Sequence, residues 1–231
     1  MKRILIKLSG EALAHEGSRY DTGMLDSVVE QIKLLQSRGT EVAIVVGGGN
    51  LFRGKELVNT ISVKRPTADY IGMLAIVQNA LVLRDYFEEH DVPTRVSSAI
   101  AMQQVCEPYI PNRCVRHLEK GRVVILAAGL GQPFFSSDTT CIQRALELSC
   151  TEVVMAKNGV DGVYTADPNK DPSARKIPTL TATEIIEQGL NFADHAAISL
   201  ARENRLSLRV IGMNDMARLG EPHLGTTILA K

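Results

Sequence analysis

The segment at residues 41–54, EVAIVVGGGNLFRG, constrains the fold more than any other part of the chain. Its first half, residues 42–46, is an apolar and largely β-branched run, which is typical of a strand buried on both faces of a parallel sheet. The three glycines at 47–49 then end the strand. Consecutive glycines cost backbone entropy, but they let the main chain approach a bulky polar group. With Arg53 close behind them, they predict an anion site, most simply a phosphate site.

Strand-like apolar runs alternate with helical patterns along the chain, which predicts an α/β fold: a three-layer α/β/α sandwich around a mostly parallel central sheet. Neither a repeat nor a linker divides the sequence, so we expect a single domain over residues 1–231. The expected strands are residues 3–8, 42–46, 93–97, 122–127, 152–156, 208–211 and 226–229. The expected helices are residues 21–38, 67–89, 113–120, about 138–149, 183–188 and 194–204.

Two local expectations are specific enough to be tested by a structure. In the helix at 67–89, Thr67 is a candidate N-cap. The dipeptide Asp161-Gly162 is typical of the turn of a β-hairpin. Residues 99–111 show no clear pattern. The core-facing residues of the helix at 67–89 are expected to be Ile71, Leu74, Val77 and Leu81.

Composition narrows the class of protein. Lys and Arg total 26 and Asp and Glu total 26, so there is no net charge to collect nucleic acid. Aromatic residues make up 4% and Trp is absent, which argues against base-stacking platforms. Lys7 interrupts the first apolar run, which excludes a typical signal peptide, and we see no run near the ~20 apolar residues of a membrane span. Four cysteines without C-x-x-C spacing argue against zinc, so we expect a cytoplasmic protein with reduced thiols, bound to neither membrane nor nucleic acid.

Two familiar nucleotide-binding motifs are excluded by single positions. Residues 49–55 fit the G-x-x-x-x-G-K of a P-loop, but Glu56 stands where Ser or Thr must hold Mg²⁺. Residues 129–131, Gly-Leu-Gly, lack the third glycine of the dinucleotide fingerprint. The phosphate site at 47–49 therefore belongs to neither of these classes.

Three expected strands end in glycine-bearing turns, at residues 7–10 (KLSG), 47–49 and 129–131. In a parallel sheet these turns share one edge, so several anion cradles should lie together. Lys7 is a candidate phosphate contact, although an isolated lysine on an edge strand is the alternative. Asp138, at a helix start, would be either a plain N-cap or a group that orients Lys7 or holds Mg²⁺. Cations and cradles without a protein nucleophile favour phosphoryl transfer, which depends on positioning and charge stabilisation.

Five motifs resemble those of the bacterial uridylate kinases, which have the amino-acid-kinase fold. They occur in order and with similar spacing over nearly the whole chain. The resemblance implies transfer of the γ-phosphoryl of ATP to UMP, with Mg²⁺ carried mainly by the ATP phosphates. It also implies a homohexamer, inhibition by UTP and possible activation by GTP, although residues 15–20 differ from relatives in a segment that the family links to GTP. The motifs are KLSGEAL at 7–13, GGGNLFRG at 47–54, DYIGMLA at 69–75, GQPFFSSD at 131–138 and NGVDGVYTADP at 158–168.

The resemblance also implies roles for individual residues. Residues 1–150 would mainly serve UMP, and residues 151–231 would mainly serve ATP. Tyr164 suits a purine face, and Asp167 suits ribose hydroxyls unless it only makes a turn. The glycines would leave room for two phosphate chains that meet. The implied catalytic residues are Lys7, Arg53 and Asp138. The implied ATP contacts are Lys7, Leu8, Ser9, Gly10, Gly49, Arg53, Asn158, Tyr164 and Asp167. The implied UMP contacts are Gly48, Asp69, Leu130, Gly131, Gln132, Pro133, Phe134, Phe135, Ser136 and Ser137.

Two other functions remain open at this point. A kinase acting on carbamate or on an amino-acid carboxylate would share the fold, the lysine and the glycine turns. A non-catalytic nucleotide- or oxyanion-binding protein would keep the pocket and lose the charges of the phosphoryl centre.

Overall fold

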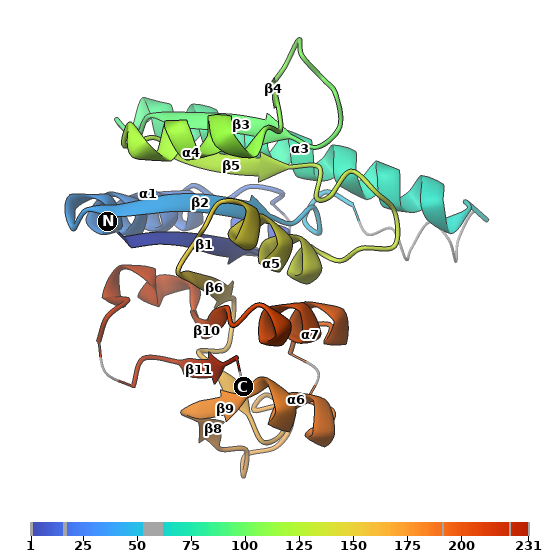
Figure 1. The fold of residues 1–231 in the computed structure, drawn as a ribbon, viewed down its shortest axis with the longest axis vertical. Coiled ribbons are helices and arrows are strands. Elements are labelled where there is room, and N and C mark those ends of the chain that lie inside the picture. The colour runs from blue at the N-terminus through green and yellow to red at the C-terminus, as the bar shows by residue number, and fades with distance from the viewer. Residues whose placement is uncertain (1, 16–17, 53–61, 191, 222, 231) are drawn as a thin grey trace.

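The computed structural model describes residues 2–15, 18–52, 62–190, 192–221 and 223–230. Its core is a nine-stranded sheet in the order β4-β3-β5-β2-β1-β6-β10-β11-β9 (Figure 1). Neighbouring strands run parallel except β10 and β11, which pair antiparallel. The strands are β1 Lys2–Leu8, β2 Thr40–Val46, β3 Thr94–Ser98, β4 Glu107–Pro108, β5 Val123–Ala127, β6 Glu152–Lys157, β9 Thr179–Thr181, β10 Ser207–Gly212 and β11 Thr226–Leu229. The mostly parallel sheet expected from the sequence is confirmed.

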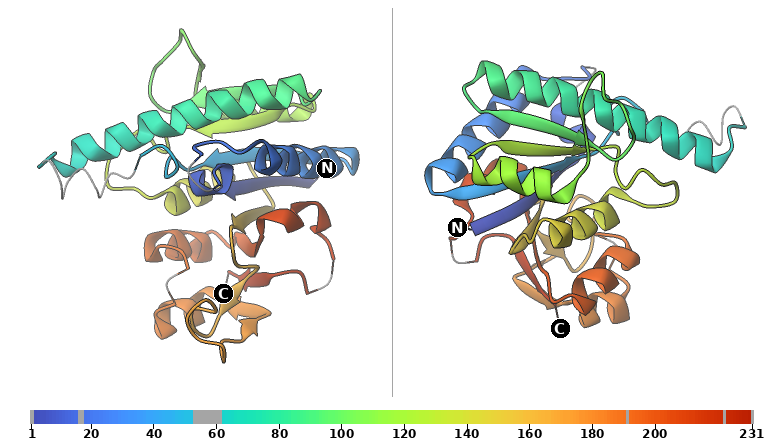
Figure 2. Two further views of the ribbon diagram at one scale, coloured as in Figure 1. Left: turned by 180° about the vertical axis from the view of Figure 1, so that it is seen from behind. Right: turned by 45° about the horizontal axis from the view of Figure 1, so that its top comes forward.

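Helices cover both faces of the sheet, which gives the three layers (Figure 2). On β1, Ile4 and Ile6 face a core shared with α1, α3 and η2, whereas Leu5 faces a core shared with α4, α5, α6 and α7. This alternation follows from the two-residue period of a strand. The helices are α1 Thr22–Ser37, α3 Arg65–Glu89, α4 Pro111–Glu119, α5 Ser137–Glu147, α6 Ala182–Gln188 and α7 His195–Glu203, with short 3-10 turns η1 Gly10–Leu13 and η2 Met213–Arg218.

Helix α1 follows its sequence signals. Asp21 accepts a hydrogen bond from the Met24 amide at 3.0 Å and caps the helix. Gly39, with φ of +74°, lies just beyond its end. The turn leads directly into β2, which pairs in parallel with β1 as a β-α-β unit requires.

Helix α3 corrects two expectations. It begins at Arg65 with a proline in its first turn, and Lys64 precedes it without a side-chain cap, so Thr67 is not the N-cap. Leu74 is 43% exposed, and the buried face instead carries Met73, Val77 and other residues. Val77 is buried as expected, and Leu81 is partly buried against the same core. The remaining buried residues of the helix are Ala68, Ala75, Asn79, Ala80, Leu83 and Phe87.

By length and composition alone, α3 is also apolar enough to cross a membrane. Its place in the fold is different. Met73, Val77 and Phe87 pack in the core cluster over the sheet, and 39% of its most apolar window is buried inside the protein. We therefore describe α3 as a core helix.

The hairpin prediction at Asp161-Gly162 is wrong. The strands β7 Val163–Tyr164 and β8 Lys176–Ile177 do pair antiparallel, but the connection is residues 165–175, and the dipeptide precedes β7. Gly162 is needed for another reason, because a Cβ there would lie 2.8 Å from Thr226 Oγ1.

Candidate active site

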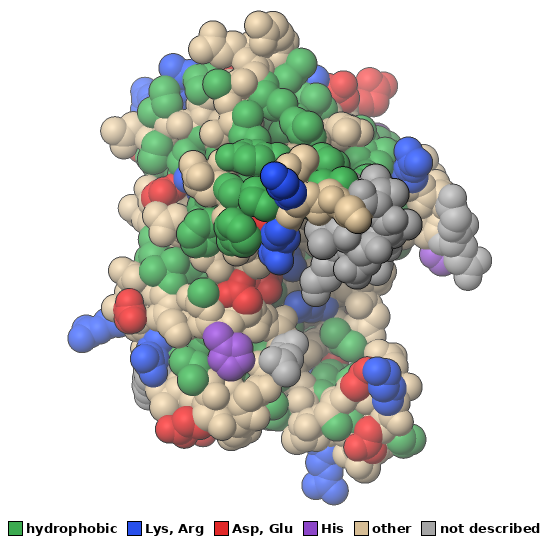
Figure 3. All heavy atoms as spheres, turned by 90° about the vertical axis from the view of Figure 1, so that its right-hand side faces the viewer, with side chains coloured by type: hydrophobic (Ala, Val, Ile, Leu, Met, Phe, Trp, Pro, Cys, Tyr) green, Lys and Arg blue, Asp and Glu red, His purple; other side chains and the backbone are tan. Residues whose placement is uncertain are grey.

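The carboxyl ends of β1, β2, β5 and β6 meet at one edge of the sheet. Figure 3 faces this edge, where Lys and Arg side chains lie beside Asp and Glu side chains near the centre. Strand β1 is paired on both sides, with β2 and with β6. Lys7 therefore stands in the middle of the sheet, and the edge-strand interpretation of this lysine is excluded.

Lys7 and Asp138 form an ion pair at the centre of the edge. Lys7 Nζ lies 3.2 Å from Asp138 Oδ1, and the side chains are only 11% and 16% exposed. Ser136 is the N-cap of α5 and accepts from the Asp138 amide at 3.1 Å, so Asp138 is not the cap itself. Asp138 Oδ1 is buried and accepts no hydrogen bond of regular geometry from the described residues. The carboxylate is thus directed at the lysine rather than at the helix.

Lys157, at the end of β6, is a third charged group that the sequence reasoning did not single out. Its Nζ donates to the Phe192 carbonyl at 2.9 Å. Burial lowers the pKa of Lys157, the nearby ammonium of Lys7 lowers it further, and Asp138 opposes both. One carboxylate therefore faces two ammonium groups, which leaves a local positive charge suited to an anion. The signal was available, because a lysine at the end of an expected strand is what identified Lys7.

The glycine turn after β2 packs against the turn after β1. The Gly47 amide donates to the Leu8 carbonyl at 2.9 Å. A Cβ on Gly10 would lie 2.6 Å from the Gly49 amide nitrogen. A Cβ on Gly48 would lie 3.0 Å from Ala75 Cβ and 3.1 Å from the Gly72 carbonyl of α3. Packing within the protein thus accounts for these glycines, which corrects the idea that phosphate chains alone exclude side chains there.

Gly49 is different from its neighbours. Among the described residues, the atoms nearest to a Cβ at this position belong to the Glu11 side chain, at 3.4 Å, which is ordinary contact. None of residues 47–49 has a positive φ, so backbone conformation does not require glycine either. Packing against the described residues therefore does not require a glycine at position 49.

A cavity of about 220 Å³ opens beside the ends of β2 and β5, between the glycine turn and α3. It brings six of the ten implied UMP contacts together with Gly49, which we had expected on the ATP side. Met73 and Ile76 of α3 give it an apolar wall. The six residues are Gly48, Asp69, Leu130, Gln132, Phe135 and Ser137; the four that do not line it are Gly131, Pro133, Phe134 and Ser136.

Asp69 connects α3 to the loop after β5. Its carboxylate accepts from the Phe134 amide at 2.8 Å and from Arg65 Nε at 2.8 and 3.0 Å. The Arg65 guanidinium also lies 5.6 Å from the centre of the Phe134 ring. Asp69 is 20% exposed at its side chain, so it is accessible from the cavity while it holds the loop.

Ser136 is occupied by structural contacts. Besides capping α5, its hydroxyl donates to Asp194, the residue that caps α7. Thr139 donates to the same carboxylate at 3.0 and 3.1 Å. Burial opposes ionisation of Asp194, but hydrogen bonds led by that of Ser136 lower its pKa. The start of α5 is therefore fixed to the start of α7.

A second cavity, of about 330 Å³, opens beside the ends of β6 and β10. It is lined by Lys157, Asn158, Tyr164 and residues 212–215, among others. Tyr164 donates to Asp161 Oδ1 at 2.6 Å. The two cavities are thus on opposite sides of β1, the first lined by residues before 150 and the second by residues after it.

The other implied ATP contacts are placed less directly. Leu8 is fully buried in β1. Ser9 accepts from the Ala12 amide at 3.2 Å and caps η1. Asp167 accepts from the Asn169 amide at 3.0 Å, so the turn is present and the ribose contact stays a prediction. Arg53 lies outside the described residues.

The sequence of this chain matches the model of a known protein family. The model of the amino acid kinase family matches residues 2–212, most of the chain. The chain belongs to the amino acid kinase family. Among curated relatives, it is 52% identical to a uridylate kinase of Nocardioides sp. over 92% of this chain and 89% of that protein. It is 48% identical to a uridylate kinase of Bifidobacterium adolescentis over 98% and 91% of the two chains.

Solved structures agree with the family. The chain is similar to a UMP kinase from Bacillus anthracis, with a TM-score of 0.94, 39% identity and coverage of 100% of this chain and 96% of that one. It is also similar to a UMP kinase from Ureaplasma parvum, with a TM-score of 0.88, 32% identity and coverage of 99% and 98%. The amino-acid-kinase fold expected from the five motifs is therefore confirmed.

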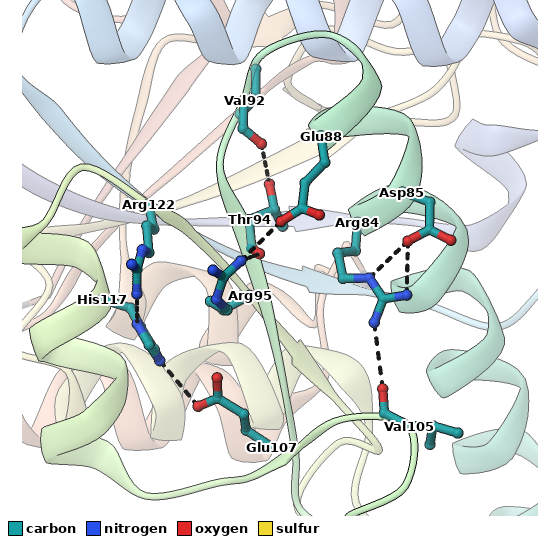
Figure 4. Close-up of polar contacts among 10 residues, drawn as sticks. All are labelled: Arg84, Asp85, Glu88, Val92, Thr94, Arg95, Val105, Glu107, His117 and Arg122. Carbon is teal, nitrogen blue, oxygen red and sulfur yellow. Dashed lines mark hydrogen bonds and ion pairs between the residues drawn. The ribbon is translucent and has the colours of Figure 1, made fainter.

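A larger cavity lies away from Lys7, on the side of β3 and β4. This open cavity, of about 740 Å³, lies between the second half of α3, β3 and residues 103–108. Four of its charged residues form two pairs, Arg95 with Glu88 at 2.9 Å and Arg84 with its neighbour Asp85 (Figure 4). None of the expected site residues that the structure describes lines it. The phosphoryl centre is therefore assigned to the smaller cavities beside Lys7.

Proposed function

We propose that this chain is a uridylate kinase, a nucleoside monophosphate kinase that transfers the γ-phosphoryl of ATP to UMP and yields UDP and ADP. The observation that carries the proposal is the position of Lys7 between the two cavities, on the central strand of the sheet. The identity of about 50% to curated uridylate kinases supports the choice of UMP.

The cavity beside β2 and β5 is proposed for UMP and the cavity beside β6 and β10 for ATP. The apolar wall at Met73 and Ile76 suits a base, and Asp69 suits ribose hydroxyls. Asn158 and Tyr164 would contact the adenosine side. An acceptor site of about 220 Å³ with an apolar wall favours a nucleotide over carbamate or a small carboxylate, which is the substrate of the rival kinase on the same fold.

At the centre, Lys7 would stabilise the charge that develops on the transferring phosphoryl group, and Asp138 would hold its ammonium in place. Lys157 would bind donor phosphate oxygens from the other side. The UMP phosphate is already anionic near neutral pH, so no residue is needed as a general base. The reaction then depends on bringing two phosphates together over one cation.

Among the described residues, few protein groups at this centre could bind Mg²⁺ directly. The described residues contain no group of three or more His, Cys, Asp or Glu placed to hold a metal ion. Asp138, whose Oδ1 is buried without a regular hydrogen bond, is the carboxylate suited to approach a cation carried by ATP. When bound, Mg²⁺ would neutralise phosphate charge. The described residues would themselves supply two positioned cations, Lys7 and Lys157.

The resemblance also suggests a cytoplasmic enzyme of pyrimidine nucleotide biosynthesis. Three further hypotheses follow from it: assembly as a homohexamer, inhibition by UTP and activation by GTP. Sedimentation of the purified chain tests the first. Rates with and without each nucleotide test the other two.

The function is tested by ADP release from ATP with UMP, CMP, carbamate or N-acetylglutamate as acceptor. We expect turnover with UMP. Lys7→Ala should reduce kcat by about 10²–10³-fold, the usual cost of losing transition-state charge stabilisation. Lys33→Ala is the control, since Lys33 is a surface residue of α1 paired only loosely with Glu30 at 4.0 Å.

Two outcomes would contradict the proposal. Turnover only with carbamate or a carboxylate would make the chain an amino-acid-type kinase. Tight ATP binding with no turnover for any acceptor would make it a binding protein.

A further inference from the structure

A buried pair of amides connects α3 to the glycine turn. Asn79, which is completely buried, donates through Nδ2 to the Gly47 carbonyl and to Asn50 Oδ1, both at 2.7 Å. Its Oδ1 accepts from the Tyr20 hydroxyl at 2.9 Å and from Asn50 Nδ2 at 3.2 Å. Both donors and both acceptor positions of the Asn79 amide are therefore used.

Asparagine is a poor choice for the buried face of a helix on general grounds. It favours helix less than apolar residues do, and a buried amide costs free energy unless it is fully hydrogen-bonded. Within the described residues, the hydrogen bonds of the Asn79 side chain go to other segments and none to the backbone of α3. The amide thus serves the segments that it contacts rather than the helix that carries it.

Those segments are the ones around the phosphoryl centre. Asn50 ends the glycine turn, and its Oδ1 would be 2.6 Å from a Cβ on Gly10, in the turn after Lys7. Asn50 Nδ2 also donates to the Arg19 carbonyl at 2.8 Å. The turns after β1 and β2 therefore pack closely, and the amide pair holds the glycine turn in this position together with the hydrogen bond from the Gly47 amide to the Leu8 carbonyl.

The same helix fixes the loop after β5. Asp69, on α3, accepts from the Phe134 amide at 2.8 Å, and Gly72 and Ala75 limit how closely Gly48 can approach. Helix α3 therefore contacts both walls of the acceptor cavity. Asn79 is the point at which the glycine-turn wall is hydrogen-bonded to it.

We propose that Asn79, paired with Asn50 and oriented by the Tyr20 hydroxyl, is a positioning residue that fixes the glycine turn relative to Lys7 and thereby governs the phosphoryl-transfer step. This inference rests on the proposed kinase function. Burial also raises the pKa of Tyr20, although Arg19 lowers it, so the hydroxyl remains a donor at neutral pH. Asn79 acts through the turn and contacts neither nucleotide.

The test compares Asn79→Asp with Thr94→Val. The aspartate keeps the size of the side chain but loses both N–H donors and directs a carboxyl oxygen at the Gly47 carbonyl. Thr94 is also completely buried and makes one side-chain hydrogen bond, to the Val92 carbonyl at 2.8 Å, at the opposite end of the strands. Both variants lose buried hydrogen bonds, so a general loss of stability should affect both.

We expect Asn79→Asp to lower kcat by about 10²-fold, the effect of misplacing a reacting group by roughly 1 Å, with the KM values of ATP and UMP changed much less. Thr94→Val should leave kcat unchanged. Hydrogen exchange of a peptide covering residues 44–52 should be faster in Asn79→Asp and unchanged in Thr94→Val. A folded Asn79→Asp protein with kcat and exchange close to wild type would overturn the proposal.

Tyr20→Phe is the milder second variant, which removes one hydroxyl and keeps the ring. We expect kcat to fall by about threefold to tenfold, as for one lost hydrogen bond, with faster exchange in the same peptide. If Asn79→Asp does not fold, Tyr20→Phe decides, and wild-type kcat together with wild-type exchange would overturn the proposal. Hydrogen exchange does not require turnover. An inactive wild-type protein would therefore refute the kinase function, while the exchange comparison would still test whether Asn79 fixes the glycine turn.

Discussion

At the scale of single residues, the centre is defined by an imbalance of charge. Asp138 is the carboxylate that faces both Lys7 and Lys157, and burial makes an extra ammonium costly in the free protein. A bound phosphate chain would remove that cost. Binding of phosphate groups would therefore lower the electrostatic free energy of the site, which suits an enzyme that binds two anionic substrates.

Lys157→Met separates function from stability. We expect kcat to fall by about 10²-fold, because a cation beside the donor phosphates is lost. The free energy of unfolding at pH 7 should be unchanged or higher, because a buried charge is replaced by an apolar chain of similar length. Assays and urea unfolding of both proteins measure the two effects.

The same variant has a pH signature. The pKa of Lys157 is lowered in the folded protein, so the folded wild type loses this proton before the unfolded chain does. Wild type should therefore gain stability relative to Lys157→Met as pH rises through that lowered pKa. A stability difference that is constant with pH would mean that the pKa of Lys157 is not lowered in the folded protein.

Asp69→Asn should weaken the acceptor side. Asparagine can still accept from the Phe134 amide but loses the charge that pairs with Arg65 and the second acceptor oxygen offered to a ribose. We expect the KM of UMP to rise by about tenfold or more, from the loss of a hydrogen bond to a charged group. Initial rates at varied UMP and varied ATP check this. A selective rise in the KM of ATP would contradict the assignment.

At the scale of elements, the glycine turn is held between helix α3 and the turn after β1. Gly48 and Gly49 are neighbours with different surroundings, and this makes them a matched pair. A methyl group on Gly48 would meet α3 at 3.0–3.1 Å, whereas one on Gly49 would make ordinary contact with Glu11. Packing and ligand binding can therefore be tested separately.

Gly48→Ala should destabilise the protein by about 1–3 kcal/mol, the range for overpacking, and lower activity with it. Gly49→Ala should keep wild-type thermal stability and still lose turnover, if a phosphate lies against that position. Thermal unfolding and steady-state rates of the two variants make the comparison. Full activity in Gly49→Ala would remove this residue from the phosphate site.

The same scale shows what the sequence could and could not predict. Strands β1, β2, β5 and β6 each contain a run of consecutive apolar residues, so their existence and a mostly parallel sheet could be predicted. Helix α3 is apolar around nearly its whole circumference between Tyr70 and Leu83, so periodicity could not select Met73 over Leu74 as a core residue. Strands β4 and β9 are too short to leave a pattern, and their pairing depends on neighbours far along the chain.

For the candidate site, the sequence identified Lys7 and Asp138, and the structure places them 3.2 Å apart. Asn79 and Lys157 were missed. Lys157 at the end of β6 repeats the signal that identified Lys7, whereas an asparagine in an apolar helix is ordinary in sequence. The hydrogen bonds of Asn79 to distant segments are displayed only by the folded chain.

At the scale of the whole molecule, the edge opposite the active site is held by ion pairs. Glu152 on β6 accepts from Lys2 at 3.0 Å and from Arg209 at 2.8 Å, which joins β1, β6 and β10. Arg3 pairs with Glu41 at 2.6 Å, which joins β1 to β2. These contacts hold the central strands together at the end where no substrate is expected.

Glu152→Gln should lower the free energy of unfolding at pH 7 by about 1–3 kcal/mol and leave kcat unchanged. Burial opposes ionisation of Glu152, but hydrogen bonds from Arg209 and Lys2 outweigh it and lower its pKa. The stabilisation is therefore present above the ordinary pKa of a glutamate and is lost as pH falls through the lowered value. Urea unfolding from pH 7 to pH 3 should show the two proteins converging in acid; a gap that persists there would contradict this.

The central position of β1 has a consequence for chemical probes. Because its neighbours on both sides are hydrogen-bonded along its length, the backbone that carries Lys7 has little freedom to move toward a ligand. A single compound with a uridine-like head and an adenosine-like tail would have to pass its tether across the end of this strand. The protein should bind compounds with negatively charged tethers more tightly than compounds with neutral tethers of equal length. The tether length that binds most tightly would measure the distance between the two cavities.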